Sequence, residues 1–180
     1  MAKILIGFGS KAKIGKDFAV TRLKARGFDV ERIAFADELK KDLATLFKLN
    51  NLDFYGYMAD PKLKEEVRPL LVTYGQIMRD HDPDVWINRA LDGKMLTHDI
   101  TAITDVRFPN EVVALKEKGG IYIDIQAKVP CANETERQNS AILYHMADYR
   151  VTNNFDETFE LEVASLVTAL LVKSDDPDLS

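Results

Sequence analysis

Short apolar runs alternate along the chain with longer segments of helical spacing. The runs have the length and composition of buried strands and lie at residues 3–8, 30–36, 100–104, 121–125 and 149–153. The segments with helical spacing lie at residues 16–26, 37–47, 61–80, 82–91, 110–118 and from about 156 onward. This alternation predicts an α/β fold, a five-stranded parallel sheet with helices on both faces.

Several residues refine the helical part of this pattern. Asp37 and Asp82 are the first residues of two of these segments, and we expect both to be N-caps, because short polar side chains accept hydrogen bonds from the first free amides. Residues 48–60 have turn character. Pro69 lies inside the segment 61–80, and we expect it to kink or divide that helix.

The segment GSKAKIGKDF (9–18), after the first apolar run, resembles a phosphate-binding loop with two unusual positions. The usual pattern is G-x-x-x-x-G-K-[ST]; here Ser10 replaces the first glycine and Asp17 replaces the hydroxyl residue. Lys16 would reach the terminal phosphates of a donor nucleotide, and the helix that begins there adds a partial positive charge. Ser10 costs little here if its backbone angles are ordinary, since Gly9 beside it can take a strained conformation. The residues that we expect to bind the nucleotide are Gly9, Ser10, Lys11, Ala12, Lys13, Ile14, Gly15, Lys16, Asp17 and Phe18.

Asp17 has two interpretations. A carboxylate beside a triphosphate is repelled unless a divalent cation lies between them, and Mg²⁺ accepts carboxylate oxygens readily, so Asp17 would bind the metal directly or through water. Alternatively, Asp17 is an acidic residue in the first turn of a helix, where the helix dipole favours it. Both interpretations stay open.

A second polar segment, DVRFPNE (105–111), follows the third predicted strand. The loop at 9–17 follows the first strand, and parallel strands place their carboxyl ends at one edge of a sheet, where ligands bind. We therefore expect Arg107 to point into the same cleft as Lys16. Asp105 would hold Mg²⁺ or its waters, or orient Arg107. The alternative is a structural ion pair between Asp105 and Arg107.

Composition narrows the class of protein. The 180 residues fit one domain with a net charge of −5, and the single cysteine, Cys131, cannot form an internal disulfide. The acidic balance argues against binding of nucleic-acid polymers but not against a small phosphorylated ligand. No basic-then-apolar leader opens the chain and no apolar run could span a bilayer, so we expect a cytoplasmic protein without a membrane partner. The histidines lack ligand spacing, and we expect no zinc site at His81, His98 or His145.

Four segments in order resemble the deoxynucleoside monophosphate kinases of tailed bacteriophages: the GKD end of the loop, FADELK, YGQIMRDHDPDVW and ITDVRFPNE. The resemblance spans about residues 7–154. It implies a three-layer P-loop NTPase fold in a single domain over 1–180, with a helical acceptor-binding region at about 37–92 and a lid at about 127–148. It also implies transfer of the terminal phosphoryl group of ATP, with Mg²⁺, to a deoxynucleoside 5′-monophosphate, which gives the diphosphate. A phage-encoded enzyme of this kind would act in the host cytoplasm.

This chemistry needs several cations. Donor and acceptor together bring about five or six negative charges into one cleft, so arginines and lysines must surround them. The catalytic candidates are Lys16, Asp105, Arg107, Arg79 and Arg137. The substrate-binding candidates are Asp37, Lys40, Arg68, Arg79, Trp86 and Arg107.

Several acceptor candidates have a structural alternative. In the structural alternative Asp37 is an ordinary N-cap and Arg79 caps the C-terminal end of a helix. Arg68, in the same alternative, forms i,i+4 pairs on a solvated helix face. Trp86 is an aromatic residue at helical spacing, which is more often part of a core than a stacking surface for a base.

The lid and the base site depend on few residues. Within 127–148 we expect Arg137 to swing over the ATP phosphates as a lid closes and excludes water, although the His-Ser-Glu-like stretch usual in the family is not evident here. Asn153 and Asn154 follow the fifth strand, where the fold packs a loop against adenine; a plain turn is the alternative.

Two other functions stay open. A dephospho-coenzyme A kinase or another small-molecule P-loop kinase would keep the fold and change the acceptor. A nucleotide-binding module without catalysis would hold ATP on the same loop, although the converging arginines favour a second phosphorylated ligand. We expect ATP, Mg²⁺ and a small-molecule acceptor as ligands, and a homodimer stays open.

Overall fold

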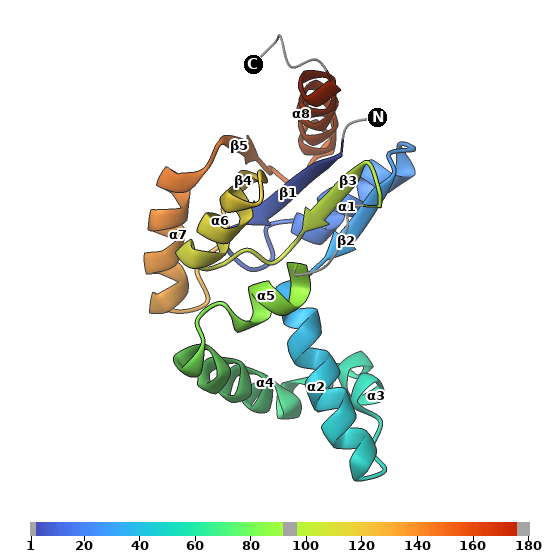
Figure 1. Ribbon diagram of the computed structural model, residues 1–180, viewed down its shortest axis with the longest axis vertical. Helices are drawn as coiled ribbons and strands as arrows, with labels where there is room; N and C mark the ends of the chain where they lie inside the picture. The colour runs from blue at the N-terminus through green and yellow to red at the C-terminus, as the bar shows by residue number, and fades with distance from the viewer. Residues whose placement is uncertain (1–2, 92–96, 176–180) are drawn as a thin grey trace. The chain divides into compact units, whose positions relative to one another are not determined.

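The computed structural model describes residues 3–91 and 97–175, in which parallel strands alternate with helices (Figure 1). The strands are β1 Ile4–Gly9, β2 Val30–Ile33, β3 Ile100–Ile103, β4 Ile121–Gln126 and β5 Tyr149–Thr152. The helices are α1 Lys16–Ala25, α2 Phe35–Leu49, α3 Phe54–Ala59, α4 Pro61–His81, α5 Val85–Leu91, α6 Pro109–Glu117, α7 Glu134–Met146 and α8 Glu157–Asp175. No helix within these described ranges is long and apolar enough to cross a bilayer.

The five strands form one parallel sheet in the order β2-β3-β1-β4-β5, which confirms the predicted fold class. The central strand β1 pairs with β3 on one side, where Ile4 lies opposite Ile100, and with β4 on the other, where Gly9 lies opposite Asp124. All six residues of β1 are buried, which explains its uninterrupted apolar sequence. Because β1 and β3 are parallel neighbours, the loops that follow them leave the same edge of the sheet side by side.

Helices cover both faces of this sheet and complete three layers (Figure 1). α1 and α8 pack against each other on one face, and α6 and α7 pack against each other on the opposite face. The main core lies on the first face, where Phe159, Val163 and Val167 of α8 pack with Ile6 and Phe8 of β1. These α8 residues are four positions apart along the helix and therefore form one apolar stripe.

The chain divides into two compact units, which are Met1–Ile33 with Lys94–Ser180, and Ala34–Gly93. The first unit contains the sheet with α1, α6, α7 and α8. The second, which we call the helical unit, contains α2 to α5. The acceptor-binding region implied by the sequence, about 37–92, falls in the helical unit, and its last residue lies outside the described part of the chain.

The first helix of the helical unit begins earlier than the sequence predicts. α2 starts at Phe35, which is 1% exposed, because an early start buries this ring. Asp37 therefore lies in the first turn, where its own amide donates to the Ala34 carbonyl at 3.0 Å. The N-cap prediction for Asp37 is wrong.

The segment 48–60 is not a run of turns, because α2 continues to Leu49 and α3 follows. Aromatic packing explains the extra helix: Phe54 of α3 is 2% exposed, and its ring lies edge-to-face with Phe47 of α2 at 5.3 Å between centroids. Asp60 then caps α4, since its carboxylate accepts hydrogen bonds from the first free amides. Tertiary contacts outweigh the turn-like composition here.

α4 runs through Pro69 without interruption, so the predicted division is wrong. Pro69 lies on the exposed side of α4, whereas Val67 and Gly75 are buried and hold both halves of the helix in one packed arrangement. Asp82 is not the N-cap of a helix that starts at residue 83, because α5 starts at Val85. Its carboxylate accepts the Asp84 amide at 3.0 Å in the turn that joins α4 to α5.

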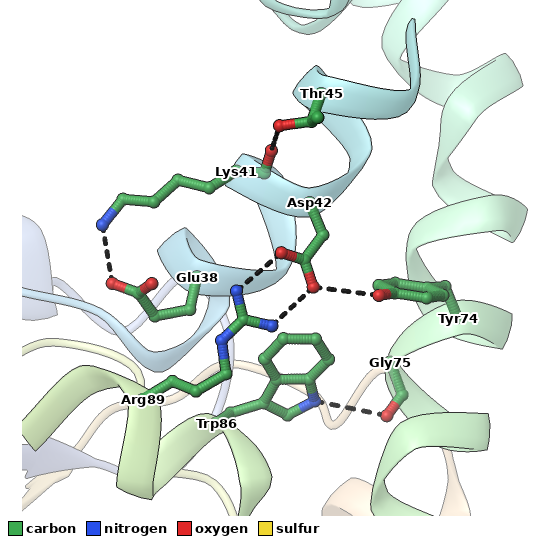
Figure 2. A network of polar contacts seen from close by, with 8 residues as sticks. All are labelled: Glu38, Lys41, Asp42, Thr45, Tyr74, Gly75, Trp86 and Arg89. Carbon is green, nitrogen blue, oxygen red and sulfur yellow. Dashed lines mark hydrogen bonds and ion pairs between the residues drawn. The ribbon is translucent and has the colours of Figure 1, made fainter. Parts of the chain in front are cut away.

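A polar network joins α2, α4 and α5 within the helical unit (Figure 2). Asp42 accepts two hydrogen bonds from the Arg89 guanidinium, both at 2.6 Å, and one from the Tyr74 hydroxyl at 2.9 Å. Arg89 also lies over the Trp86 ring, 5.3 Å from its centroid, and the Trp86 indole donates to the Gly75 carbonyl. The Arg89 hydrogen bonds hold the pKa of Asp42 below its ordinary value of 3.8.

Asp42→Asn should lower the free energy of unfolding by about 0.5–1 kcal/mol at pH 7, because Arg89 loses its charged partner. The pair is partly exposed, and solvent screening keeps the effect small. A depressed pKa in the folded state adds stability above the unfolded pKa and loses it as the pH falls through the folded pKa. Urea unfolding of both proteins should therefore differ at pH 7 and converge in acid, with Glu66→Gln as a surface control. An equal difference at both pH values would contradict the ionic origin.

Candidate functional site

The candidate site is the loop between β1 and α1, at the carboxyl end of the central strand. Left-handed backbone conformations occur at Lys13, with φ 61°, and at Gly15, with φ 95°, but not at Gly9. The left-handed positions of the loop are therefore Lys13 and Gly15 and not Gly9. Gly9 is needed for close packing instead, because a Cβ there would lie 2.2 Å from the Tyr122 hydroxyl.

Lys16, the first residue of α1, is 6% exposed and donates a hydrogen bond to the Lys11 carbonyl across the loop. Burial lowers the pKa of Lys16 to about 8, and the positive charge of Arg107 acts in the same direction. The carboxylates of Asp105 and Asp17 act in the opposite direction. The structure therefore brings together the four residues that the sequence placed at this edge of the sheet.

This pKa predicts a proton uptake when ATP binds. At pH 8 to 9 a large share of Lys16 is neutral in the free protein, and the phosphates would favour the charged form and raise its pKa. Phosphate esters lose their last proton at about pH 6, so protons that are taken up above pH 8 bind to the protein and not to the nucleotide. Calorimetric titrations in two buffers of different ionisation enthalpy should show proton uptake that increases from pH 7 to pH 8.5. Binding without proton uptake at pH 8.5 would contradict the assignment of Lys16.

Asp17 ties the start of α1 to the ends of β2 and β3. Its Oδ1 accepts hydrogen bonds from Arg32 Nε at 2.8 Å and Thr104 Oγ1 at 2.9 Å. Partial burial raises the pKa of Asp17, but these two hydrogen bonds and the nearby cations hold it below its ordinary value. The side chain is 70% exposed, so an ionised carboxylate faces solvent beside the loop.

Asp17 and Asp105 are the residues that could hold Mg²⁺. Both carboxylates act on the charge of Lys16 and so lie near the loop. Within residues 3–91 and 97–175, no three His, Cys, Asp or Glu side chains gather into a metal-binding group. Mg²⁺ in kinases is usually held by one or two carboxylates together with substrate phosphates and water. The donor set fits a cation that arrives with a nucleotide.

The segment after β3 holds Arg107 by its backbone. Glu111 is 3% exposed, and its Oε2 accepts the amides of Arg107 at 2.6 Å and Phe108 at 3.0 Å. The Arg107 side chain is exposed, and its guanidinium makes no hydrogen bond or ion pair within the described chain. The alternative ion pair between Asp105 and Arg107 does not form. Arg107 is thus a positioned cation that an anionic ligand can reach.

A cavity of about 560 Å³ lies beside the loop. Its walls include Gly15, Phe18 and Arg22, from the end of the loop and α1, and Asn153 and Phe155, which follow β5. Phe18 is 49% exposed and Phe155 is 63% exposed, so both present apolar surface to a ligand. Charged residues also line the cavity, namely Lys13, Asp156, Glu157 and Glu160. Its size is that of a small-molecule site.

Asn153 connects the loop to the turn after β5. Its Nδ2 donates to the Ile14 carbonyl at 3.0 Å, and its Oδ1 accepts the Phe155 amide at 2.7 Å. The side chain is 4% exposed but contributes to the cavity wall. The structure thus contains the turn that was the alternative for Asn153, and contact with a base stays a prediction.

α7 lies in the segment 127–148, and two of its side chains contact the loop. Glu136 Oε1 accepts the Ala12 amide at 2.8 Å, and the Ser140 and Ser10 hydroxyls are 3.0 Å apart. The residues of α7 that contact the loop are therefore Glu136 and Ser140, and not the candidate lid arginine.

Arg137, that candidate, pairs with Glu134 one turn away in α7, with nitrogen–oxygen distances of 2.6 and 2.7 Å. Its side chain is 67% exposed. The structure shows no contact between Arg137 and the loop within the described residues, so its role over ATP phosphates stays a prediction.

Two acceptor candidates on α2 contact each other. The Lys40 ammonium lies 2.8 Å from an Asp37 oxygen, an i,i+3 ion pair with partly exposed side chains. Trp86 is 2% exposed and lies in the core of the helical unit, which is the position that aromatic residues at helical spacing usually take. Its ring has no exposed face for a base to stack on.

The two arginine candidates on α4 also have local contacts. Arg68 pairs with Glu65 at 2.8 and 2.9 Å on the exposed side of the helix, an i,i+3 pair where we expected i,i+4 pairs. Arg79 lies in the last turn, and its guanidinium is 3.4 Å from the Gly75 carbonyl, which lies one turn earlier in α4. The helix-face alternative for Arg68 is thus present in the structure, whereas the contact of Arg79 with Gly75 is not a C-terminal cap. Binding of an acceptor by these residues stays a prediction.

Sequence reasoning missed several residues around the loop. Thr104 and Arg32 hold Asp17, and both lie at the end of a strand that the sequence identified. Phe155 follows the Asn153-Asn154 pair and could have been noted as an aromatic residue at a strand end. Glu136 gave no signal, because an acidic residue in the first turn of a helix usually serves only the helix dipole.

Comparison with known proteins agrees with the geometry of the loop. A family model described as phosphomevalonate kinase matches residues 8–120, which run from the end of β1 to the residue before β4 and include both Lys16 and Arg107. Among solved structures, dephospho-CoA kinase from Campylobacter jejuni is 13% identical over 94% of this chain and 98% of that chain, with a TM-score of 0.46. TT1252 from Thermus thermophilus is 15% identical over 96% of this chain and 98% of that chain, with a TM-score of 0.40. Because the family match covers more than half of the chain and includes the loop, the chain belongs to the phosphomevalonate kinase family, and it is an ATP-dependent P-loop kinase that acts on a small molecule.

Proposed function

We propose that the protein transfers the terminal phosphoryl group of ATP to the 5′-phosphate of a deoxynucleoside monophosphate. The observation that supports this most is the position of Lys16 and Arg107 after the neighbouring strands β1 and β3, where the charge of Arg107 helps to lower the pKa of Lys16. Two unit charges 4 Å apart repel by about 4 kcal/mol at an effective dielectric constant near 20. Anionic phosphates between the two cations would remove this repulsion, and a reaction between two phosphates brings such anions together.

Each group then has a role in the transfer. Lys16 and the loop amides would bind the terminal phosphates of ATP, and Arg107 would stabilise the charge on the phosphoryl group as it moves. An oxygen of the acceptor phosphate forms a bond to the γ-phosphorus while the bond to ADP breaks. Mg²⁺, held by Asp17 and Asp105, would supply further positive charge against the phosphates of ATP.

The cavity beside the loop is our candidate site for the adenine base. Phe18 and Phe155 could stack against the two faces or edges of a purine, because both rings are exposed at the cavity wall. Asn153, whose polar atoms are used within the chain, would shape the cavity and not read the base.

The acceptor rests on the resemblance of FADELK, YGQIMRD and DVRFPNE to the phage kinases. In this proposal the acceptor-binding residues are Asp37, Lys40, Arg68, Arg79 and Arg107, and Arg137 belongs to a lid. Phosphomevalonate is a second candidate acceptor, favoured by the family match over residues 8–120. It is also a phosphorylated compound, so the same cations would suit it.

A coupled assay of ADP release with a panel of acceptors tests the proposal. The panel holds the four common deoxynucleoside monophosphates, their ribose counterparts, phosphomevalonate and dephospho-CoA. We expect acceptor-dependent ADP release with at least one deoxynucleotide. Turnover with phosphomevalonate alone would identify phosphomevalonate as the acceptor in place of a deoxynucleotide, with the same phosphoryl transfer. ATP binding without acceptor-dependent turnover would favour a nucleotide-binding module.

A further inference from the structure

Glu136 of α7 occupies the anion-binding side of the loop. Its Oε1 accepts the Ala12 amide at 2.8 Å, and its Oε2 accepts the Ala132 amide at 2.6 Å. Its own amide donates to the side chain of Asn133, the N-cap of α7, at 2.8 Å. Both carboxylate oxygens are therefore in use, and one of them is held by a loop amide.

The charge of Glu136 strengthens this contact. Burial raises the pKa of Glu136, but the hydrogen bonds from the Ala132 and Ala12 amides and the charges of Arg107 and Lys16 hold it below its ordinary value. Glu136 is therefore an anion at neutral pH, and it is attracted by the same two cations that would bind phosphates.

Two further contacts seat the same segment on the loop. Ser140, one turn beyond Glu136 on α7, lies against Ser10 at 3.0 Å between hydroxyl oxygens. The Lys11 ammonium donates to the Val129 carbonyl at 3.4 Å. Three successive loop residues, from Ser10 to Ala12, thus contact the stretch 129–140, so the Glu136 hydrogen bond is part of a docked surface.

ATP needs the groups that Glu136 uses. Amides of a phosphate-binding loop at a helix N-terminus bind phosphate oxygens through the same geometry by which Ala12 binds a carboxylate. One N–H donates well to one acceptor, so the carboxylate and a phosphate oxygen cannot both hold the Ala12 amide. We propose that Glu136 is an internal competitor of the ATP phosphates, and that this residue sets the affinity of the loop for phosphorylated nucleotides. This inference rests on the proposed use of the loop for ATP.

Glu136→Gln tests the competition because it keeps the size of the side chain and removes its charge. We expect the Kd for ATP to fall about tenfold, because hydrogen bonds to charged groups contribute more than neutral ones. The Kd for adenosine, which has no phosphate, should stay unchanged. Isothermal titration of the full chain with both ligands measures this difference, and Glu117→Gln, at the exposed end of α6, controls for the lost charge.

Glu136→Asp provides a second variant should the first fail to fold. It keeps the charge but is one methylene shorter, so it cannot reach the Ala12 amide from the same backbone position, and it should also bind ATP more tightly than the wild type. Unchanged or weaker ATP binding in the folded variants would overturn the inference, as would an equal gain for adenosine or in Glu117→Gln. A wild-type protein that binds no ATP at all would instead contradict the proposed function.

Discussion

Arg107→Ala should lower kcat by about three orders of magnitude while the fold survives. Arginines that stabilise a moving phosphoryl group contribute factors of about 10³–10⁵, and single donors to a transition-state anion contribute about 10²–10³. The Arg107 side chain is exposed, and Glu111 holds the backbone amides of this segment whatever side chain residue 107 has. Catalysis should therefore be lost without a loss of structure.

Steady-state kinetics and thermal unfolding check this result. Arg107→Lys should fall between the wild type and the alanine variant, because lysine keeps the charge but lacks the planar group that binds two oxygens at once. Lys173→Ala, near the exposed end of α8, removes a cation of no proposed role and should leave turnover unchanged. Near-normal turnover in a folded Arg107→Ala protein would show that Arg107 does not belong to the catalytic site.

Lys16→Ala should abolish most turnover and also weaken ATP binding, which distinguishes it from the arginine variant. The ammonium group would contact the phosphates of ATP in the ground state and in the transition state, so both Kd and kcat should suffer. Stability should not fall with activity, because burial of Lys16 disfavours its charge and removal of the side chain relieves that cost. We expect an unfolding temperature equal to or above that of the wild type.

Titration with ATP, the ADP-release assay and thermal unfolding separate these effects for Lys16→Ala. A large fall in unfolding temperature would mean that the hydrogen bond to the Lys11 carbonyl is mainly structural. Unchanged ATP affinity in a stable variant would place the phosphates elsewhere.

The sheet and the loop could be predicted because their signals are local. β1 is buried at every position, and its sequence is apolar without interruption. Gly15 and Lys16 stand where a left-handed turn and a helix start are required, and the structure has both. Since strand direction follows from the alternating pattern, the common edge for Lys16 and Arg107 could be derived without coordinates.

The residues that the sequence did not reveal depend on contacts between distant segments. Asp17 is held by Thr104, and Ala12 by Glu136, in each case a partner about a hundred residues away. No motif marks Glu136, and Thr104 lies in the ITDVRFPNE segment but nothing there indicates that its hydroxyl contacts Asp17. The start of α2 at Phe35 likewise follows from burial of an aromatic ring and not from a capping residue.

The tight contact between Gly9 and Tyr122 couples the loop to the neighbouring strand. A methyl group at position 9 would meet the Tyr122 hydroxyl at 2.2 Å, and removal of that oxygen alone would leave ring carbons at 2.8 and 2.9 Å. A side chain at position 9 is therefore tolerated only together with an aliphatic residue at position 122. Across related sequences the two positions should covary, with glycine opposite an aromatic ring and larger residues opposite aliphatic ones.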